Sequence, residues 1–278
     1  MKCYDCPRGC GADREDGESG YCGIGADVGI AKVINDFEYE EPCLGERLTA
    51  VFFAGCSLGC SYCQNYKISR GMCGEAYDTQ SLAALLDSAP NDIDLVTPSH
   101  CITALERAVT LCTRRRRMIF NTSGYDTVKT VVRARRFCDV FLADMKYAEP
   151  EIAQRYSNAS DYFDVTIRAL TEMRKTADEW TEKNGRRILE RGLVVRHLVL
   201  PGHVSNSLKV LDAVKSELGT DTVISLMSQF TPNGVGEPYV RLKSLEYKIV
   251  AEHAVKLGFK TGYIQDTASA DVSYTPKF

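Results

Sequence analysis

The chain has 278 residues, enough for one large domain or for one domain with a small appendage. Its 44% hydrophobic and 26% charged residues are ordinary for a globular protein, and a formal net charge of −3 gives no reason to expect a nucleic-acid partner. The sequence contains no apolar stretch of about 18 residues, so we expect no membrane span. The polar N-terminus lacks the apolar centre of a signal peptide, which favours a cytoplasmic location.

Twelve cysteines are many for such a chain, and most of them fall near its start. In a reducing compartment, cysteines rarely form disulfides. They are more often ligands of a metal or cluster, or small apolar side chains buried in the core. The early cysteines are Cys3, Cys6, Cys10, Cys22, Cys43, Cys56, Cys60, Cys63 and Cys73.

Residues 1–47 are rich in glycine and cysteine and hold few apolar residues, so a bound metal is expected to stabilise them. Four cysteines follow one another as Cys3-x2-Cys6-x3-Cys10-x11-Cys22. Four thiolates suit either a closed structural zinc site or a complete iron–sulfur cluster. Cys43 could serve as a substitute or additional ligand.

From Leu48 onwards, short apolar runs alternate with amphipathic segments. The runs predict strands, and the segments between them predict helices. The predicted strands are Leu48–Ala54, Asp94–Thr97, Met118–Asn121, Val140–Asp144, Val194–Leu200, Val223–Met227 and Thr261–Gln265. The predicted helices are Thr79–Ala89, Ile102–Arg115, Thr127–Phe137, Tyr162–Glu182, Ser205–Leu218 and Leu242–Leu257.

This alternation predicts an α/β fold with a parallel sheet and right-handed crossovers. The number of repeats is too low for a complete eight-stranded barrel, so residues 48–278 are expected to form a partial (β/α)6 TIM-type barrel. Residues 1–47 would be a small cysteine-rich metal-binding extension. Functional side chains are expected at the carboxyl ends of the barrel strands.

The most specific local pattern is Cys56-x3-Cys60-x2-Cys63, which directly follows the apolar run AVFFAG. Three thiolates from one loop can hold three corners of a [4Fe–4S] cluster and leave the fourth iron open to a ligand. Zinc is the alternative metal, but a fourth ligand within a few residues is missing. Three buried cysteines without a metal are the remaining interpretation.

The spacing resembles that of the radical S-adenosylmethionine (SAM) superfamily, including an aromatic residue, Tyr62, before the last cysteine. VVRHLVLPGH (194–203) resembles the fifth-strand motif of pyruvate formate-lyase activating enzyme and its relatives. DMK (144–146) resembles their fourth-strand motif, and NTSGY (121–125) their third-strand end. With CYDCPRGCG, GYCG, EEPC and SLMSQFTP, these motifs resemble a branch of radical SAM proteins related to that enzyme, over nearly the whole chain.

The resemblance implies that Cys56, Cys60 and Cys63 hold a [4Fe–4S] cluster whose free iron binds SAM. One electron delivered to the cluster would cleave a C–S bond of SAM, giving methionine and a 5′-deoxyadenosyl radical. That radical would take a hydrogen atom from a substrate. Reduced flavodoxin or ferredoxin is the expected electron donor.

The resemblance also implies which strand ends contact SAM. Asp144 and a catalytic Lys146 would lie beside it, with Tyr62 next to the cluster. Asn121, Thr122 and Ser123 would lie near SAM and near a monovalent cation. The relatives commonly have aspartate where this chain has Asn121, so the cation site stays open.

Two further strand ends offer candidates. Thr97-Pro98-Ser99-His100 stands where the activating enzymes have a Gly-Gly-Glu-type segment for the SAM amino group, so Ser99 and His100 could supply acceptors. His100 could equally begin the following helix. Arg196 and His197 alternate on their strand, so only one of them can face the barrel interior. Arg196 is the better clamp for the SAM carboxylate because its guanidinium is a planar fork of donors.

Three functional hypotheses are open for this chain, although the strand-end motifs have no reason to occur together in the third. The first is activation of a glycyl-radical enzyme, in which the substrate is a glycine of a partner protein. The second is radical modification of a peptide or small molecule, in which an N-terminal cluster binds the substrate or relays an electron. The third, from another class, is a non-catalytic iron–sulfur or zinc protein that acts as a redox carrier or scaffold.

Overall fold

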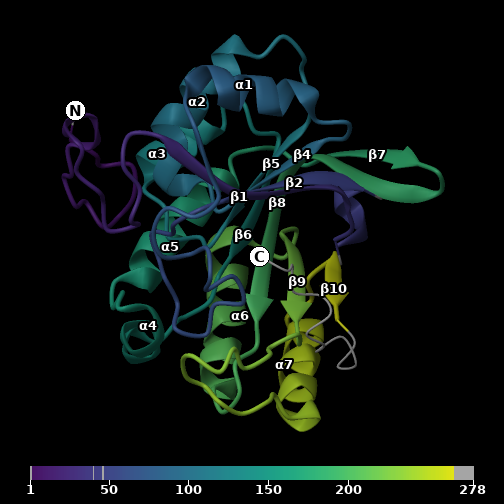
Figure 1. Ribbon diagram of the computed structural model, residues 1–278. Helices are drawn as coiled ribbons and strands as arrows, with labels where there is room; N and C mark the ends of the chain where they lie inside the picture. Colours follow the sequence, from purple (N-terminus) through teal and green to yellow (C-terminus); the bar gives the residue numbers. More distant parts are fainter. Residues whose placement is uncertain (1, 40, 46, 266–278) are drawn as a thin grey trace.

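The structure is a computed structural model that describes residues 2–39, 41–45 and 47–265 (Figure 1). One curved sheet runs through the molecule, and helices pack on its outer side. Among the described residues, no helix has the length and apolar character needed to cross a membrane.

The centre of the sheet consists of parallel strands that neighbour one another in chain order. They are β2 (Leu48–Phe53), β4 (Ile93–Val96), β5 (Met118–Thr122), β6 (Val140–Asp144), β8 (Arg186–Leu198), β9 (Val223–Met227) and β10 (Gly262–Ile264). The hydrogen-bonded path between the described strands ends at β10 on one side and at β3 (Glu75–Tyr77) on the other, so the barrel is open. The predicted α/β fold with a partial barrel is confirmed.

Helices connect these strands and cover the outer face of the sheet. They are α1 (Thr79–Ser88), α2 (Ile102–Leu111), α3 (Val128–Ala134), α4 (Pro150–Ser157), α5 (Tyr162–Met173), α6 (Val204–Leu218) and α7 (Ser244–Leu257). Asp78 and Thr127 cap α1 and α3 by accepting the main-chain N–H three residues on. The short 3-10 helices are η1 (Arg14–Asp16), η2 (Pro42–Leu44) and η3 (Ser99–Cys101).

The sheet also contains a strand from the segment that the sequence assigned to the cysteine-rich extension. β1 (Val28–Phe37) pairs antiparallel with β2 and with β3. The described residues of the extension before Val28 form no regular strand. They still contact the barrel, because Cys22 and Ile24 are buried in the same core cluster as Val51 and Phe53.

Two predicted helices are wrong in their extent. The helix predicted over Tyr162–Glu182 ends at Met173, and β7 (Glu179–Lys183) then forms a hairpin with the first half of β8. The turn of this hairpin is Asn184-Gly185, with positive φ at both residues, which is the geometry that this dipeptide favours. The helix predicted over Ile102–Arg115 ends at Leu111, because Asp87 accepts hydrogen bonds from the main-chain N–H groups of the next turn.

The amino ends of the strands are closed by an apolar floor. η2 lies across this end, and Arg117 fixes it by donating to the carbonyl of Leu44 and, at 2.7 Å, to that of Leu189. The floor is a fully apolar cluster that includes Leu44, Leu48, Ile119, Val140, Val194 and Val223. A closed floor leaves the carboxyl ends of the strands as the accessible end of the barrel.

Candidate active site

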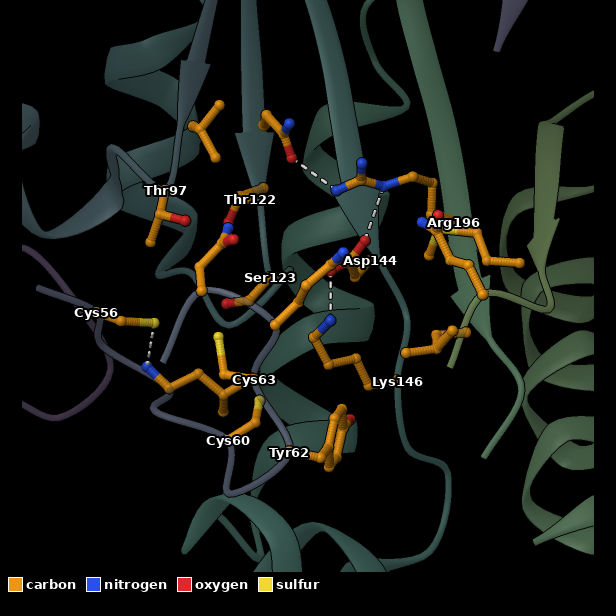
Figure 2. A pocket seen from close by; sticks show the side chains of 18 of the residues that line it. Cys56, Cys60, Tyr62, Cys63, Thr97, Thr122, Ser123, Asp144, Lys146 and Arg196 are labelled. Atoms are coloured by element: carbon orange, nitrogen blue, oxygen red, sulfur yellow. Dashed lines mark hydrogen bonds and ion pairs between the residues drawn. The ribbon is translucent and has the colours of Figure 1, made fainter. Parts of the chain in front are cut away.

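An open pocket lies at the carboxyl ends of the parallel strands (Figure 2). Residues that follow or end β2, β4, β5, β6, β8 and β9 line it, and so do residues at and after the end of β1. The predicted site residues in its lining are Cys56, Cys60, Tyr62, Cys63, Asn121, Thr122, Ser123, Asp144, Lys146 and Arg196. The fold therefore brings the three-cysteine loop and the strand ends to one place.

The three-cysteine loop is held by main-chain hydrogen bonds as it leaves β2. Gly55 has a φ of +80°, and a side chain there would lie 2.7 Å from the carbonyl oxygen of Cys22, so only glycine fits. The N–H groups of Leu58 and Gly59 both donate to the Cys56 sulfur at 3.4 Å. Hydrogen bonds of this kind stabilise negative charge on sulfur.

Cys56 is buried and Cys60 and Cys63 are half-buried, and the protein around Cys56 and Cys63 favours the protonated thiol in the absence of a cation. Burial, together with the neighbouring Cys60 and Cys56, raises the pKa of Cys63 to about 12. Burial likewise raises the pKa of Cys56. Such thiols ionise when a metal binds between them, because the cation offsets both desolvation and mutual repulsion.

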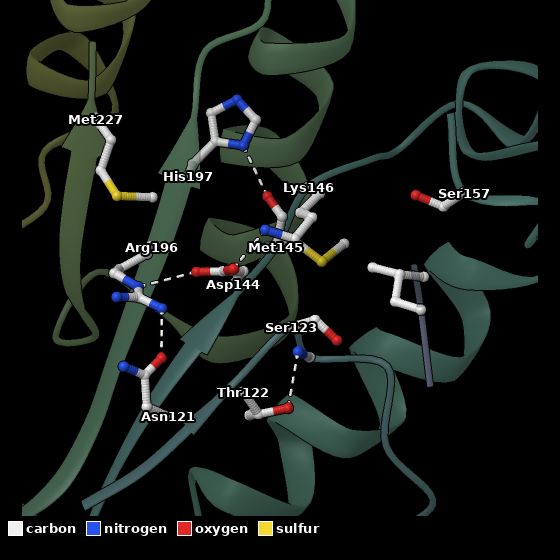
Figure 3. A network of polar contacts seen from close by, with 12 residues as sticks. Asn121, Thr122, Ser123, Asp144, Met145, Lys146, Ser157, Arg196, His197 and Met227 are labelled. Carbon is white, nitrogen blue, oxygen red and sulfur yellow. Dashed lines mark hydrogen bonds and ion pairs between the residues drawn. The ribbon is translucent and has the colours of Figure 1, made fainter. Parts of the chain in front are cut away.

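Opposite the thiols lies a network of buried charges (Figure 3). One oxygen of Asp144 accepts from Arg196 Nε at 2.8 Å, and the other accepts from Lys146 Nζ. Burial alone would raise the pKa of Asp144, but Arg196 and Lys146 outweigh it, so the pKa is lowered. One carboxylate thus holds two cations at the wall of the pocket.

The network continues into the barrel interior through Asn121. Its side-chain oxygen accepts from Arg196 at 2.6 Å, and its amide donates to Asp94 at 3.0 Å. Tyr39, from the loop after β1, also donates to Asp94. Asp94 is fully buried, and burial raises its pKa to about 6 despite these bonds. Asn121 therefore links a buried acid to the pocket cations, and neither Tyr39 nor Asp94 was predicted.

The structure decides between the two alternating residues of β8. Arg196 lines the pocket, whereas His197 faces α6, where it contacts the Met145 carbonyl at 2.7 Å and Ser207 Oγ at 2.8 Å. Burial lowers the pKa of His197 to about 4, so it is neutral.

Ser99 and His100 do not line the pocket, so the expectation that they contact a ligand directly is corrected. They form η3, whose side chains turn back into the protein. Ser99 Oγ lies 3.2 Å from Thr122 Oγ1, and His100 Nε2 lies 2.7 Å from the Ala54 carbonyl oxygen. Thr97, two residues before Ser99, lines the pocket instead, with a φ of +64°. The turn at Thr97-Pro98 thus directs Ser99 and His100 away from the pocket.

The N-terminal cysteines come together beside the barrel. A side-chain carbon at Gly20 would lie 3.3 Å from the Cys10 sulfur and 3.4 Å from the Cys22 sulfur. Burial, together with the neighbouring thiols of Cys22, Cys3 and Cys10, raises the pKa of Cys6 to about 12. Arg14 donates to the Cys22 sulfur at 3.3 Å, which places one cation at this group of thiols.

Cys43 does not join these thiols. It lies in η2 within the apolar floor, at the opposite end of the strands from the pocket, and is completely buried beside Leu44 and Leu48. The suggestion that Cys43 is an additional ligand is therefore wrong in this structure, because the thiol packs as a small apolar side chain. Among the described residues, no three Cys, His, Asp or Glu side chains converge as ligands of a single metal ion.

The site also contains residues that the motifs did not indicate. Asn233 donates to the carbonyls of Ser61 at 2.9 Å and Cys63 at 3.2 Å, which ties the loop after β9 to the three-cysteine loop. Phe230 of the same loop packs against Tyr62, with ring centroids 5.9 Å apart. In the sequence, this loop was indicated by the motif SLMSQFTP, which was part of the family resemblance but had no assigned role.

Comparison with known proteins gives distant similarities. No family model matches the chain. The uncharacterized protein MJ0674 of Methanocaldococcus jannaschii is 24% identical over an alignment 278 residues long, gaps included. The alignment covers 93% of this chain and 74% of that protein. Two solved structures are similar in part. A domain of pyruvate-formate lyase-activating enzyme from Bacteroides vulgatus has a TM-score of 0.40 and 12% identity, over 61% of this chain and 91% of that domain. Methylornithine synthase (PylB) has a TM-score of 0.48 and 14% identity, over 75% of this chain and 60% of that protein.

Proposed function

We propose that this protein is a radical SAM enzyme. The observation that carries the proposal is the common position of the three-cysteine loop and the Asp144–Lys146–Arg196 network in one pocket. Cys56, Cys60 and Cys63 would hold a [4Fe–4S] cluster, and three ligands leave one iron for a small molecule. When bound, the cluster supplies the electron for reductive cleavage of SAM.

The pocket residues have complementary tasks toward SAM. Lys146 and Arg196 offer donors to its carboxylate, and both are kept charged in a site that excludes most water, each 14% exposed. Asp144 orients the two cations before the ligand arrives, so little reorganisation is needed on binding. Tyr62 is fixed by a 2.7 Å hydrogen bond to the Tyr147 hydroxyl and forms an apolar wall beside Cys63.

The test is formation of 5′-deoxyadenosine and methionine in equal amounts from SAM. Protein reconstituted anaerobically with iron and sulfide is incubated with SAM and dithionite, and the products are quantified by mass spectrometry. Cys60→Ala should reduce the yield at least 100-fold. Cys112→Ala is the matched control, because its half-buried thiol lies near the carbonyls of Ala83 and Ala108, away from the pocket lining. Absence of 5′-deoxyadenosine from the wild type, or an undiminished yield from Cys60→Ala, would exclude the proposal.

For the substrate, we propose a glycine of a partner protein, so that the enzyme activates a glycyl-radical enzyme. In support, the pocket edge near the cysteine loop carries the uncharged groups Gln64, Gln229 and Thr231, which suit main-chain peptide groups. A glycyl-radical enzyme from the same organism, labelled with α-deuterated glycine, should develop a radical signal and pass deuterium to 5′-deoxyadenosine. If 5′-deoxyadenosine forms without deuterium transfer, the substrate is another peptide or a small molecule.

We further propose that Cys3, Cys6, Cys10 and Cys22 bind a second cluster or a zinc ion. Their proximity and the single cation of Arg14 support a metal-binding group of thiolates. Iron and zinc counts on anaerobically purified protein distinguish the two. About eight irons per chain indicate two [4Fe–4S] clusters, and about four irons with one zinc indicate a zinc site.

A further inference from the structure

Arg8 belongs to the N-terminal cysteine segment, yet its side chain contacts the three-cysteine loop. It donates from Nε to the carbonyl oxygen of Ser57 at 2.8 Å and from Nη2 to that of Leu58 at 3.2 Å. It also donates to the carbonyls of Ser157 at 2.8 Å and Asn158 at 2.5 Å, at the end of α4. The Arg8 guanidinium thus joins its own segment to two others, which lie about 50 and about 150 residues further along the chain.

The two loop carbonyls belong to the same peptide groups that donate to the Cys56 sulfur. The Ser57 carbonyl shares its peptide group with the N–H of Leu58, and the Leu58 carbonyl shares its own with the N–H of Gly59. Both N–H groups lie 3.4 Å from the Cys56 sulfur. Arg8 is therefore connected to the Cys56 sulfur through two peptide groups. Each of them accepts from Arg8 at its carbonyl oxygen and donates its N–H to the sulfur.

Arg8 is held in this orientation by aromatic rings as well as by carbonyls. Its guanidinium lies 4.3 Å from the ring centroid of Tyr21 and 5.2 Å from that of Tyr125. Arg70 extends the arrangement, because it donates to the next carbonyl, that of Gly59, at 2.7 Å. Three successive carbonyls of the loop thus point toward cations and away from the cysteine sulfurs.

We propose that Arg8 tunes the reduction potential of the cluster held by the three-cysteine loop, which rests on the function proposed above. A cation at a carbonyl oxygen polarises the peptide group and makes its N–H a stronger donor. Stronger N–H···S bonds stabilise the added negative charge of the reduced cluster and raise its potential. Arg8 is a positioning residue in this role, since it acts on Cys56 through Leu58 and Gly59.

This arrangement also makes the potential depend on the N-terminal cysteines. Arg8 lies between Cys6 and Cys10, so a metal bound by these thiols fixes the backbone on both sides of it. The N-terminal segment would therefore control how easily the pocket cluster accepts an electron, without having to carry that electron itself.

The experiment measures the ratio of reduced to oxidised three-cysteine cluster by electron paramagnetic resonance at a fixed solution potential. Arg8→Ala should lower this ratio about tenfold, equivalent to ~59 mV for a one-electron couple. Arg8→Lys should have a smaller effect, because a single ammonium group cannot engage both carbonyls in the same way. The matched control is Arg168→Ala on α5, whose side chain donates to a carbonyl of its own helix at 2.9 Å and which should leave the ratio unchanged.

A second measurement tests the link to the N-terminal thiols. Cys10→Ser should lower the ratio as Arg8→Ala does, and the double variant should add nothing further, because both changes remove the same influence. An unchanged ratio in Arg8→Ala would overturn the proposal, and additive effects would overturn the link through Arg8.

Hydrogen exchange on protein that holds the N-terminal metal but no cluster at the three-cysteine loop separates this proposal from the function proposed above. The Leu58 and Gly59 amides should exchange several-fold faster in Arg8→Ala than in wild type, and Arg168→Ala should not differ. Equal exchange in wild type and Arg8→Ala would overturn the proposal even if no cluster can be assembled. Failure to form 5′-deoxyadenosine with a normal Arg8 effect would exclude only the proposed reaction.

Discussion

The two groups of cysteines in this chain are positioned in different ways. The three-cysteine loop is an extension of a buried strand, and Arg8, Arg70 and Asn233 fix its carbonyls. The four N-terminal cysteines lie in a stretch with little regular structure, where η1 is the only described helix. The sulfurs of Cys10 and Cys22 both lie near Gly20, and the Cys22 sulfur accepts from Arg14. The barrel thus fixes the backbone of the first group, whereas the second group lies in an irregular segment that we expect a bound metal to stabilise.

Removing metal should therefore have its largest effect on the N-terminal segment. We expect chelation to abolish hydrogen-exchange protection over residues 2–27, because the binding free energy of such sites is about 10 kcal/mol or more. In contrast, replacing Cys56, Cys60 and Cys63 together by alanine should change the unfolding free energy of the barrel by less than about 2 kcal/mol. Mass spectrometry of exchanged peptides and urea unfolding measure the two effects. Full protection of residues 2–27 without metal would remove the difference between the two groups.

The sequence allowed the three-cysteine site to be predicted further than the N-terminal one. Strand ends are local features, so the positions of Cys56, Asp144 and Arg196 at the same edge followed from apolar runs and the parallel fold. Because side chains alternate between the two faces of a strand, only one of Arg196 and His197 could face the pocket. What the sequence could not show was the contact of Arg8 with Ser57, because it depends on how an irregular segment folds back onto the barrel.

Other misses have different causes. The hairpin of β7 and β8 had a recognisable signal in Asn184-Gly185, but the amphipathic pattern before it was extended too far. Asp94 was counted as part of a strand, and its role depends on Tyr39 from a loop that crosses the barrel. Cys43 was grouped with the other thiols by composition, although its neighbours in η2 place it in the floor.

The contact between the two groups of cysteines can be disrupted by one substitution. In Gly55→Ala, a methyl group would lie 2.7 Å from both the Cys22 carbonyl oxygen and a side-chain carbon of Ile24, at a φ of +80°. We expect a loss of about 3 kcal/mol in unfolding free energy, from backbone strain and overpacking together.

Gly17→Ala is the matched control for this substitution. Gly17 has nearly the same φ, +86°, but an added side chain there would meet nothing within 4 Å. Its cost should be limited to backbone strain, about 1 kcal/mol. Urea unfolding of both variants measures the difference, and equal losses would mean that the approach of Cys22 to Gly55 contributes no stability.

A smaller effect should come from pH, because two histidines are buried in different parts of the barrel. The carbonyl of His100 accepts from Arg14 at 2.9 Å, and His197 contacts the main chain of Met145, between Asp144 and Lys146. Burial lowers the pKa of both to about 4 from an ordinary 6.5. Below pH 6.5 the unfolded chain binds protons that the folded chain excludes, so stability present above pH 6.5 is lost as the pH falls toward 4.

Between pH 7 and pH 5.5, each histidine should therefore lower the unfolding free energy by about 1 kcal/mol. Urea unfolding at the two pH values should give a smaller loss in His100→Gln and in His197→Gln than in wild type. The two variants also divide the effect by region. In His100→Gln, the histidine contribution that remains should appear in exchange of amides around Met145, and in His197→Gln in exchange of amides around Arg14. If either variant shows the same pH response in both regions, the two groups of cysteines are coupled by more than the contacts of Arg8 and Gly55.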